Sequence, residues 1–115
     1  MTTFLGRHAD AQAHLAALRA QGRDVRVVPA ASDKAGILDA FAEALDLPDW
    51  FGHNWDALVD ALRDVEGHQG RPIEIVWDRV RDLRATARES YSIVLDILEQ
   101  VADERDDLNV TVITR

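Results

Sequence analysis

Three aspartates recur at four-residue intervals near the middle of the chain. Asp56, Asp60 and Asp64 would share one face of a helix, one turn apart from each other. Like charges at this spacing repel by about 0.2–0.5 kcal/mol per pair, and the helix dipole favours an anion only near the first turn. Stability alone would favour Lys or Arg at position 60 or 64. The row therefore indicates a face that binds a cationic group; the simpler interpretation is a solvated helix face.

The residues around this row predict a helix over residues 55–65. Pro48 ends whatever precedes it, Gly52 permits a turn, and Asn54 can cap the helix by accepting a backbone N–H. The apolar positions that follow are spaced at i, i+3, i+4 and i+7: Trp55, Leu58, Val59 and Leu62. One face of the predicted helix is thus apolar and another is acidic. Of the three tryptophans, we expect Trp55 and Trp77 in the core.

Paired carboxylates can also serve other chemistry, such as a divalent-metal site or an acid/base pair at Asp56 and Asp60. No histidine or third carboxylate converges on them locally, and no nucleophile or phosphate-cradling loop is visible. The four histidines lack metal-ligand spacing and are expected at the surface: His8, His14, His53 and His68. We therefore expect no catalytic residues, no metal site and no cofactor, and a protein that is not an enzyme.

Composition narrows the class of protein and of partner. The chain has 115 residues, 47% of them apolar, with no cysteine and a net charge of −8. A single soluble domain is expected, and its lack of a long apolar run or a leader-like start favours the cytoplasm and no membrane contact. The negative charge disfavours direct nucleic-acid binding and favours a basic protein partner, although acidity also serves solubility.

Hydrophobic periodicity predicts alternating helices and strands. Helices are expected over residues 9–21, from a cap at residue 32 or 33 to Pro48, over 55–65, weakly over 78–85, and over 87–102. Strands are expected over residues 25–28, 72–77 and 109–114, whereas residues 3–5 could be a short strand or an ordered tail. Strands separated by helices pair in parallel. The predicted fold is α/β, a small three-stranded parallel sheet flanked by helices, with an extra N-terminal helix.

Residues 47–64 resemble the signature of the barstar family, the intracellular protein inhibitors of barnase-type ribonucleases. The matching positions follow one another without a gap: Leu47, Pro48, Trp50, Phe51, Gly52, Asn54, Asp56, Ala57, Leu58, Asp60 and Leu62. The order of elements from about residue 25 to 114 is also similar to that family. The resemblance implies one barstar-like domain, with residues 25–115 as its core and residues 1–24 as an N-terminal helical extension.

The resemblance also implies roles for individual residues. In this family the second helix and the loop before it plug the ribonuclease active site. Asp60 would be the central carboxylate, placed where a substrate phosphate would lie, and Asp56 its partner one turn earlier. Trp50 would pack on the enzyme, while Gly52 and Asn54 would shape the loop and begin the helix.

Three further positions are expected to modify this site. Val59 stands where an aromatic anchor occurs in the family, and Asp64 extends the acidic face. A contact from the last helix maps to Gln100, or to Glu99 if the register differs by one residue. The predicted function is inhibition of a basic ribonuclease or ribonuclease toxin in a 1:1 complex, either guarding the cell from its own enzyme or acting as an immunity protein. The alternative is an interaction module of the same fold that binds another basic protein.

Overall fold

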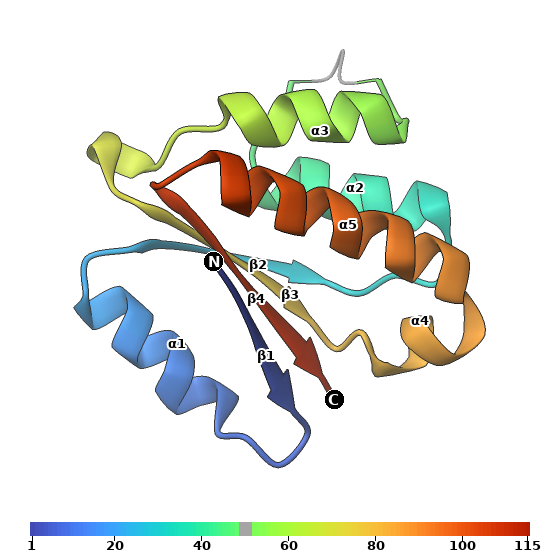
Figure 1. Cartoon of the computed structure of the whole chain (residues 1–115), viewed down its shortest axis with the longest axis horizontal. Coiled ribbons are helices and arrows are strands. Elements are labelled where there is room, and N and C mark those ends of the chain that lie inside the picture. Colours follow the sequence, from blue (N-terminus) through green and yellow to red (C-terminus); the bar gives the residue numbers. More distant parts are fainter. Residues whose placement is uncertain (49–51) are drawn as a thin grey trace.

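A computed structural model describes residues 1–48 and 52–115 (Figure 1). In this part of the chain four strands form one sheet in the order β1-β4-β3-β2: β1 Thr2–Gly6, β2 Asp24–Pro29, β3 Ile73–Asp78 and β4 Leu108–Thr114. Five α-helices accompany them: α1 Ala11–Ala20, α2 Lys34–Ala44, α3 Trp55–Asp64, α4 Arg81–Thr86 and α5 Arg88–Glu104. A short 3₁₀ turn, His68–Gly70, precedes β3. None of the helices described here has the length and apolar character needed to cross a bilayer.

The prediction of an α/β fold with a parallel sheet is confirmed, because every strand pair is parallel. The prediction of three strands is wrong. Residues 2–6 form a fourth strand, β1, which pairs with β4 from Thr2↔Val110 to Gly6↔Thr114. Five residues are too few for alternation to separate a strand from an ordered tail. The pairing with β4, more than one hundred residues away in sequence, satisfies the backbone groups of this segment.

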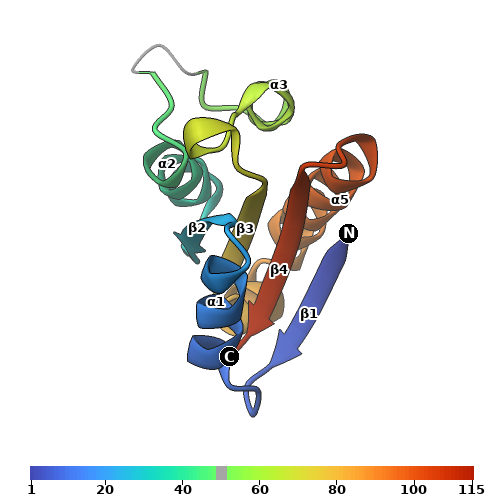
Figure 2. The ribbon, with the colours of Figure 1, turned by 90° about the vertical axis from the view of Figure 1, so that its left-hand side faces the viewer.

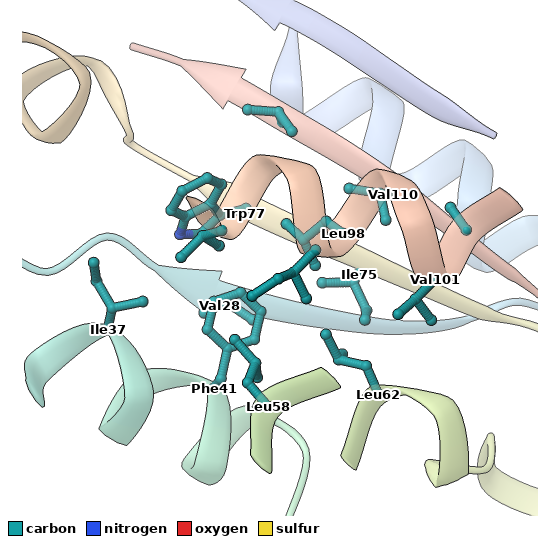
Figure 3. Packing of buried hydrophobic residues seen from close by; sticks show 14 of the residues in the cluster. Val28, Ile37, Phe41, Leu58, Leu62, Ile75, Trp77, Leu98, Val101 and Val110 are labelled. Atoms are coloured by element: carbon teal, nitrogen blue, oxygen red, sulfur yellow. The ribbon is translucent and has the colours of Figure 1, made fainter. Parts of the chain in front are cut away.

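The larger core lies between one face of the sheet and helices α2, α3 and α5 (Figure 3). Alternate residues of β3 point into it, so Ile73, Ile75 and Trp77 are fully buried. The Trp77 ring stacks on Tyr91 of α5, with their centroids 5.5 Å apart, and lies 6.3 Å from Phe41 of α2. The predicted core position of Trp77 is confirmed.

Helix α1 covers the opposite face of the sheet (Figure 2). It buries Ala11, Leu15 and Leu18 against Val76 of β3 and Ile113 of β4. The chain is therefore layered as helix, sheet and helices, with the segment before residue 25 supplying one whole layer and one edge strand.

A buried polar network lies beneath α1 on this second face. The Thr111 hydroxyl donates to the buried carboxylate of Glu74 at 2.8 Å, and the same carboxylate lies 3.1 Å from Nε of Arg23. The His14 ring is hydrogen-bonded to Thr111 at 3.1 Å. His14 is therefore partly buried, which corrects the expectation that it lies at the surface. Buried polar groups of this kind are retained when they are paired.

Candidate protein-binding site on helix α3

The first turn of α3 is formed by the residues that were predicted to form it. Asn54 has an extended backbone, and its side-chain oxygen accepts a hydrogen bond from the Ala57 N–H at 2.8 Å. The Asn54 N–H in turn donates to the Gly52 carbonyl at 2.8 Å. The predicted cap is confirmed, and it leaves Asp56 in the first turn, where the helix dipole favours its charge.

Two contacts join this end of α3 to α2. The His53 ring nitrogen lies 2.9 Å from a carboxylate oxygen of Asp39. The Lys34 ammonium, on the first residue of α2, lies 5.0 Å from the centre of the Trp55 ring. Trp55 is partly buried against the larger core. These contacts hold the entry to α3 against α2.

The apolar face of α3 orients its acidic face outward. Leu58 and Leu62 are fully buried in the larger core, as Figure 3 shows. Asp56, Asp60 and Asp64 are all exposed. Among the described residues, no basic side chain lies within 4.0 Å of any of these carboxylates. The row therefore stands in solvent without an ion-pair partner, although the Arg63 guanidinium on the same helix attracts Asp60.

Two of the three aspartates line an acidic groove beside α3. The groove has a volume of about 560 Å³, and Asp60 and Asp64 form part of one wall. Its apolar lining comes from the segment that follows α2, from α3 and from the residue after α3: Leu45, Leu47, Pro48, Ala57, Ala61 and Val65. Asp46 and Glu66 also line it, so four carboxylates surround an apolar floor. Such a surface suits a cationic group carried on an apolar stem.

Arg26 is the basic residue of this lining, and its charge is already engaged. Its guanidinium donates two hydrogen bonds of 2.9 Å to Asp24 and one of 3.2 Å to the Ala44 carbonyl. The pair raises the pKa of Arg26 and lowers that of Asp24. Of the groove carboxylates, Asp46 also helps to raise the pKa of Arg26. Among the described residues that line the groove, this one engaged arginine therefore stands against four carboxylates.

The other flank of α3 faces α5 through an ion-pair cluster. Arg63 donates two hydrogen bonds to Glu104 at 2.8 and 2.9 Å, and Gln100 donates to the same carboxylate at 3.2 Å. The hydrogen bonds from Arg63, and then that from Gln100, lower the pKa of Glu104. Val59, one turn before Arg63, is partly buried against the core. Gln100 is thus connected to α3, but through Glu104.

Arg105 holds the C-terminal end of α3. Its guanidinium donates to the carbonyls of Leu62 and Val65 at 2.8 Å each, and Asp107 holds it with two contacts of 2.9 Å. Because the last carbonyls of a helix have no partner within it, this contact satisfies groups that would otherwise need water. The position of α3 relative to α5 and β4 therefore depends on Arg105.

The predicted site residues fall into two groups. Gly52, Asp60 and Asp64 line the acidic groove, whereas Val59 and Gln100 lie on the side of α5. Two more residues belong to neither group: Asn54 caps α3 and Asp56 lies in its first turn. Trp50 lies outside the described residues.

Other residues of the site were not predicted from the sequence. Asp46 and Glu66 complete the acidic groove, Arg63 and Glu104 pair across to α5, and Arg105 supports the helix end. The signal for Arg105 in the sequence is a lone arginine among four acidic residues in the run Asp103–Asp107. Contacts between residues about 40 positions apart cannot be predicted from local sequence patterns.

No group of three His, Cys, Asp or Glu side chains within the described residues could hold a metal ion. The arrangement is instead suited to binding positively charged groups of another molecule. A family model described as Barstar (barnase inhibitor) matches residues 25–114. No curated protein matches the chain. Strand β1 and helix α1 precede the matched range.

Proposed function

Because the chain belongs to the barstar family, we propose that it inhibits a microbial, barnase-type ribonuclease by placing α3 in the active site of the enzyme. A ribonuclease active site binds phosphate through cationic side chains. Two carboxylates one turn apart on a rigid helix offer anionic groups to those cations with little loss of conformational entropy. The observation that carries this proposal is the exposed row Asp56–Asp60–Asp64, which forms no ion pair with a basic side chain of the described residues.

Each site residue has a proposed part in this complex. Asp60 takes the place of the substrate phosphate, with Asp56 as its partner, and Arg–carboxylate pairing fixes the geometry. Gly52 and Asn54 set the entry to the helix, and Trp50 packs on the enzyme. Asp64 widens the acidic surface, while Val59 and Gln100 contact the enzyme on the side of α5.

Three further carboxylates favour a partner that carries more cationic groups than a single phosphate-binding site has: Asp46, Asp64 and Glu66. They surround the groove beyond the Asp56–Asp60 pair. A second candidate function is therefore that of an interaction or immunity module for a basic protein other than a ribonuclease, with a lysine or arginine side chain entering the groove.

The test is inhibition of RNA cleavage by purified barnase-type and other microbial ribonucleases at equimolar inhibitor. We expect Asp60→Ala to weaken inhibition at least about 100-fold, since removing one member of a buried ion pair costs about 3–5 kcal/mol. Asp82→Ala is the matched control, because Asp82 is an exposed aspartate on α4, away from α3. Equal inhibition by Asp60→Ala and the parent would contradict the mechanism.

Failure to inhibit any ribonuclease would contradict the first function and leave the second to be tested. Capture of a partner from native lysate, with Asp60→Arg as the control for the acidic face, separates the two. A captured basic protein without ribonuclease activity that is lost with Asp60→Arg would favour the module.

A further inference from the structure

A second charged groove lies where the carboxyl ends of three parallel strands meet. It has a volume of about 580 Å³ and is lined by Arg7, which follows β1, by Thr114 at the end of β4, and by residues of α4 and α5, which follow β3. Figure 1 shows this end of the sheet at the bottom of the molecule, near the C-terminus, with α3 along the top. Ligands of parallel α/β sheets characteristically bind beyond the carboxyl ends of the strands.

The lining of this groove is strongly basic. Arg7, Arg81, Arg84 and Arg88 contribute to it, together with Ala85 and Thr114, and none of the described residues that line it carries a side-chain carboxylate. We call this lining the arginine groove. All four arginines are exposed, and within the described residues none has a carboxylate within 4.0 Å. Four like charges converge here in a protein whose net charge is −8. Guanidinium groups recognise phosphate by paired hydrogen bonds.

Arg115, which lies next to Thr114 in the sequence, differs from the four groove arginines because it forms an ion pair within the protein. Arg115 donates two hydrogen bonds to Asp78 at 2.8 and 2.9 Å, so its charge is matched within the protein. Arg84 lies with its guanidinium 6.0 Å from the centre of the Tyr91 ring, which positions that side chain without neutralising it. The arginines of the arginine groove thus have no ion-pair partner among the described residues, whereas the nearby Arg115 is paired with Asp78.

A hollow of about 640 Å³ with a mixed polar and apolar lining continues from the arginine groove. The two share Arg84, Arg88 and Thr114, and the hollow adds Phe4, Tyr91 and Leu95. Phe4 lies on the edge strand β1 and is 55% exposed, which is unusual for a large aromatic side chain without a partner. A flat ring beside guanidinium groups offers a platform on which a nucleic-acid base can stack.

We propose that the arginine groove and this hollow together bind a nucleoside monophosphate, with the phosphate among the arginines and the base against Phe4. A mononucleotide fits a site of this volume and has one phosphate group. A long nucleic acid is disfavoured, because its other phosphates would meet the acidic remainder of the protein. The proposed site lies at the other end of the molecule from α3 and is independent of the ribonuclease-binding function.

Isothermal titration at low salt tests the proposal with three probes: adenosine 5′-monophosphate, adenosine and inorganic phosphate. We expect the monophosphate to bind at least about tenfold more tightly than either part alone, because both halves of the site are used. Phe4→Ala should weaken binding of the monophosphate and leave that of inorganic phosphate unchanged.

Charge is tested with a matched pair of double variants. Arg84→Gln/Arg88→Gln should reduce affinity for the monophosphate by at least about tenfold. Arg19→Gln/Arg71→Gln removes the same charge from exposed positions outside the groove and should leave affinity unchanged. Inhibition of a ribonuclease should be the same for both, so a failure here is distinct from a failure of the proposed function.

Three results would overturn the proposal. The first is no binding of the monophosphate at millimolar concentration. The second is an equal loss in the Arg19→Gln/Arg71→Gln variant, which would indicate attraction by the whole molecule. The third is tighter binding of a hexaglutamate peptide than of the monophosphate, which would assign the groove to an acidic protein segment.

Discussion

At the scale of single residues, the acidic face of α3 carries a cost in the free protein. Asp60 has a like charge one turn away on either side, and Asp64 is the last residue of the helix, where the dipole disfavours an anion. None of the three carboxylates forms an ion pair with a basic side chain within the described residues, and only Asp60 is attracted by the nearby Arg63 guanidinium, which is itself paired with Glu104. Docking of a cationic partner would remove this repulsion, which is the expected pattern of a surface selected for binding.

Asp64→Asn should therefore stabilise the free protein. We expect its free energy of unfolding to rise by about 0.3–1 kcal/mol, because one unfavourable charge is removed from the C-terminal end of α3. Urea denaturation followed by far-ultraviolet circular dichroism measures the change. Asp82→Asn is the opposite control, since Asp82 is in the first turn of α4 and its charge is favourable there. A loss of stability in Asp64→Asn would show that Asp64 supports the fold.

The hydrogen bonds of Asp24 lead us to expect that the free energy of unfolding depends on pH. Its carboxylate accepts two hydrogen bonds from Arg26 and one from the His68 N–H at 2.8 Å, and these contacts lower its pKa from the ordinary value of 3.8. A carboxyl group whose pKa is lowered by folding adds stability above its unfolded pKa, and this stability is lost as the pH falls through the folded value.

The free energy of unfolding should thus fall more steeply below about pH 4 in the parent than in Asp24→Asn. Urea denaturation at a series of pH values measures both curves. Asp96→Asn, at an exposed position of α5, is the control and should follow the parent. Parallel curves for the parent and Asp24→Asn would contradict a stabilising charge at position 24.

At the scale of elements, α3 is held at both ends and along one side. Asn54 caps its start, Leu58 and Leu62 seat it on the core, and Arg105 binds its last carbonyls. The Arg63–Glu104 pair adds a contact to α5, although both side chains are about 40% exposed and such pairs contribute little to stability. The orientation of the acidic row therefore depends chiefly on burial and on the two caps.

Arg105→Ala should lower the free energy of unfolding by about 1.5–3 kcal/mol, the range for hydrogen bonds to a charged group. The carbonyls of Leu62 and Val65 would lose their donor, and Asp107 would lose its partner. Arg105→Lys should restore only part of this stability, because an ammonium cannot reach two carbonyls and a carboxylate with the same fork. Denaturant titration of both variants measures the loss.

The control for Arg105 is Arg63→Ala, which removes an exposed ion pair of the same helix. Its unfolding free energy should change by less than that of Arg105→Ala. If the two losses were equal, or if Arg105→Lys matched the parent, the proposed support of the helix end would be wrong.

At the scale of the whole molecule, charge is separated between two ends. The acidic groove borders α3, and the arginine groove lies beyond the carboxyl ends of the strands, while the net charge is −8. A basic partner would be drawn to the molecule and oriented toward α3 before contact.

The association rate with a basic ribonuclease should accordingly fall as salt is added, since the Debye length shortens from about 30 Å at 0.01 M to about 10 Å at 0.1 M. The dissociation rate should change less. Stopped-flow mixing over this range of sodium chloride measures both rates. An association rate that does not depend on ionic strength would contradict electrostatic steering.

Much of the site was predictable because its signals are local. The cap at Asn54, the apolar stripe of Leu58 and Leu62 and the acidic row are set by spacings within about eight residues, and all appear on α3 as expected. The alternation of helices and strands was sufficient to predict a parallel sheet. The family signature likewise lies within residues 47–64, inside the range matched by the family model.

Tertiary structure alone decided the features that depend on distant pairing. Strand β1 exists because β4 supplies its hydrogen-bond partners, and His14 is partly buried because Thr111 lies beneath it. The acidic groove gathers Asp46 and Glu66 from either side of α3, and Arg105 meets the end of that helix across about 40 residues of chain. The row of aspartates was thus determined by sequence, because helical spacing is a property of neighbours. Its surroundings were not, because the sheet and core decide which distant side chains meet it.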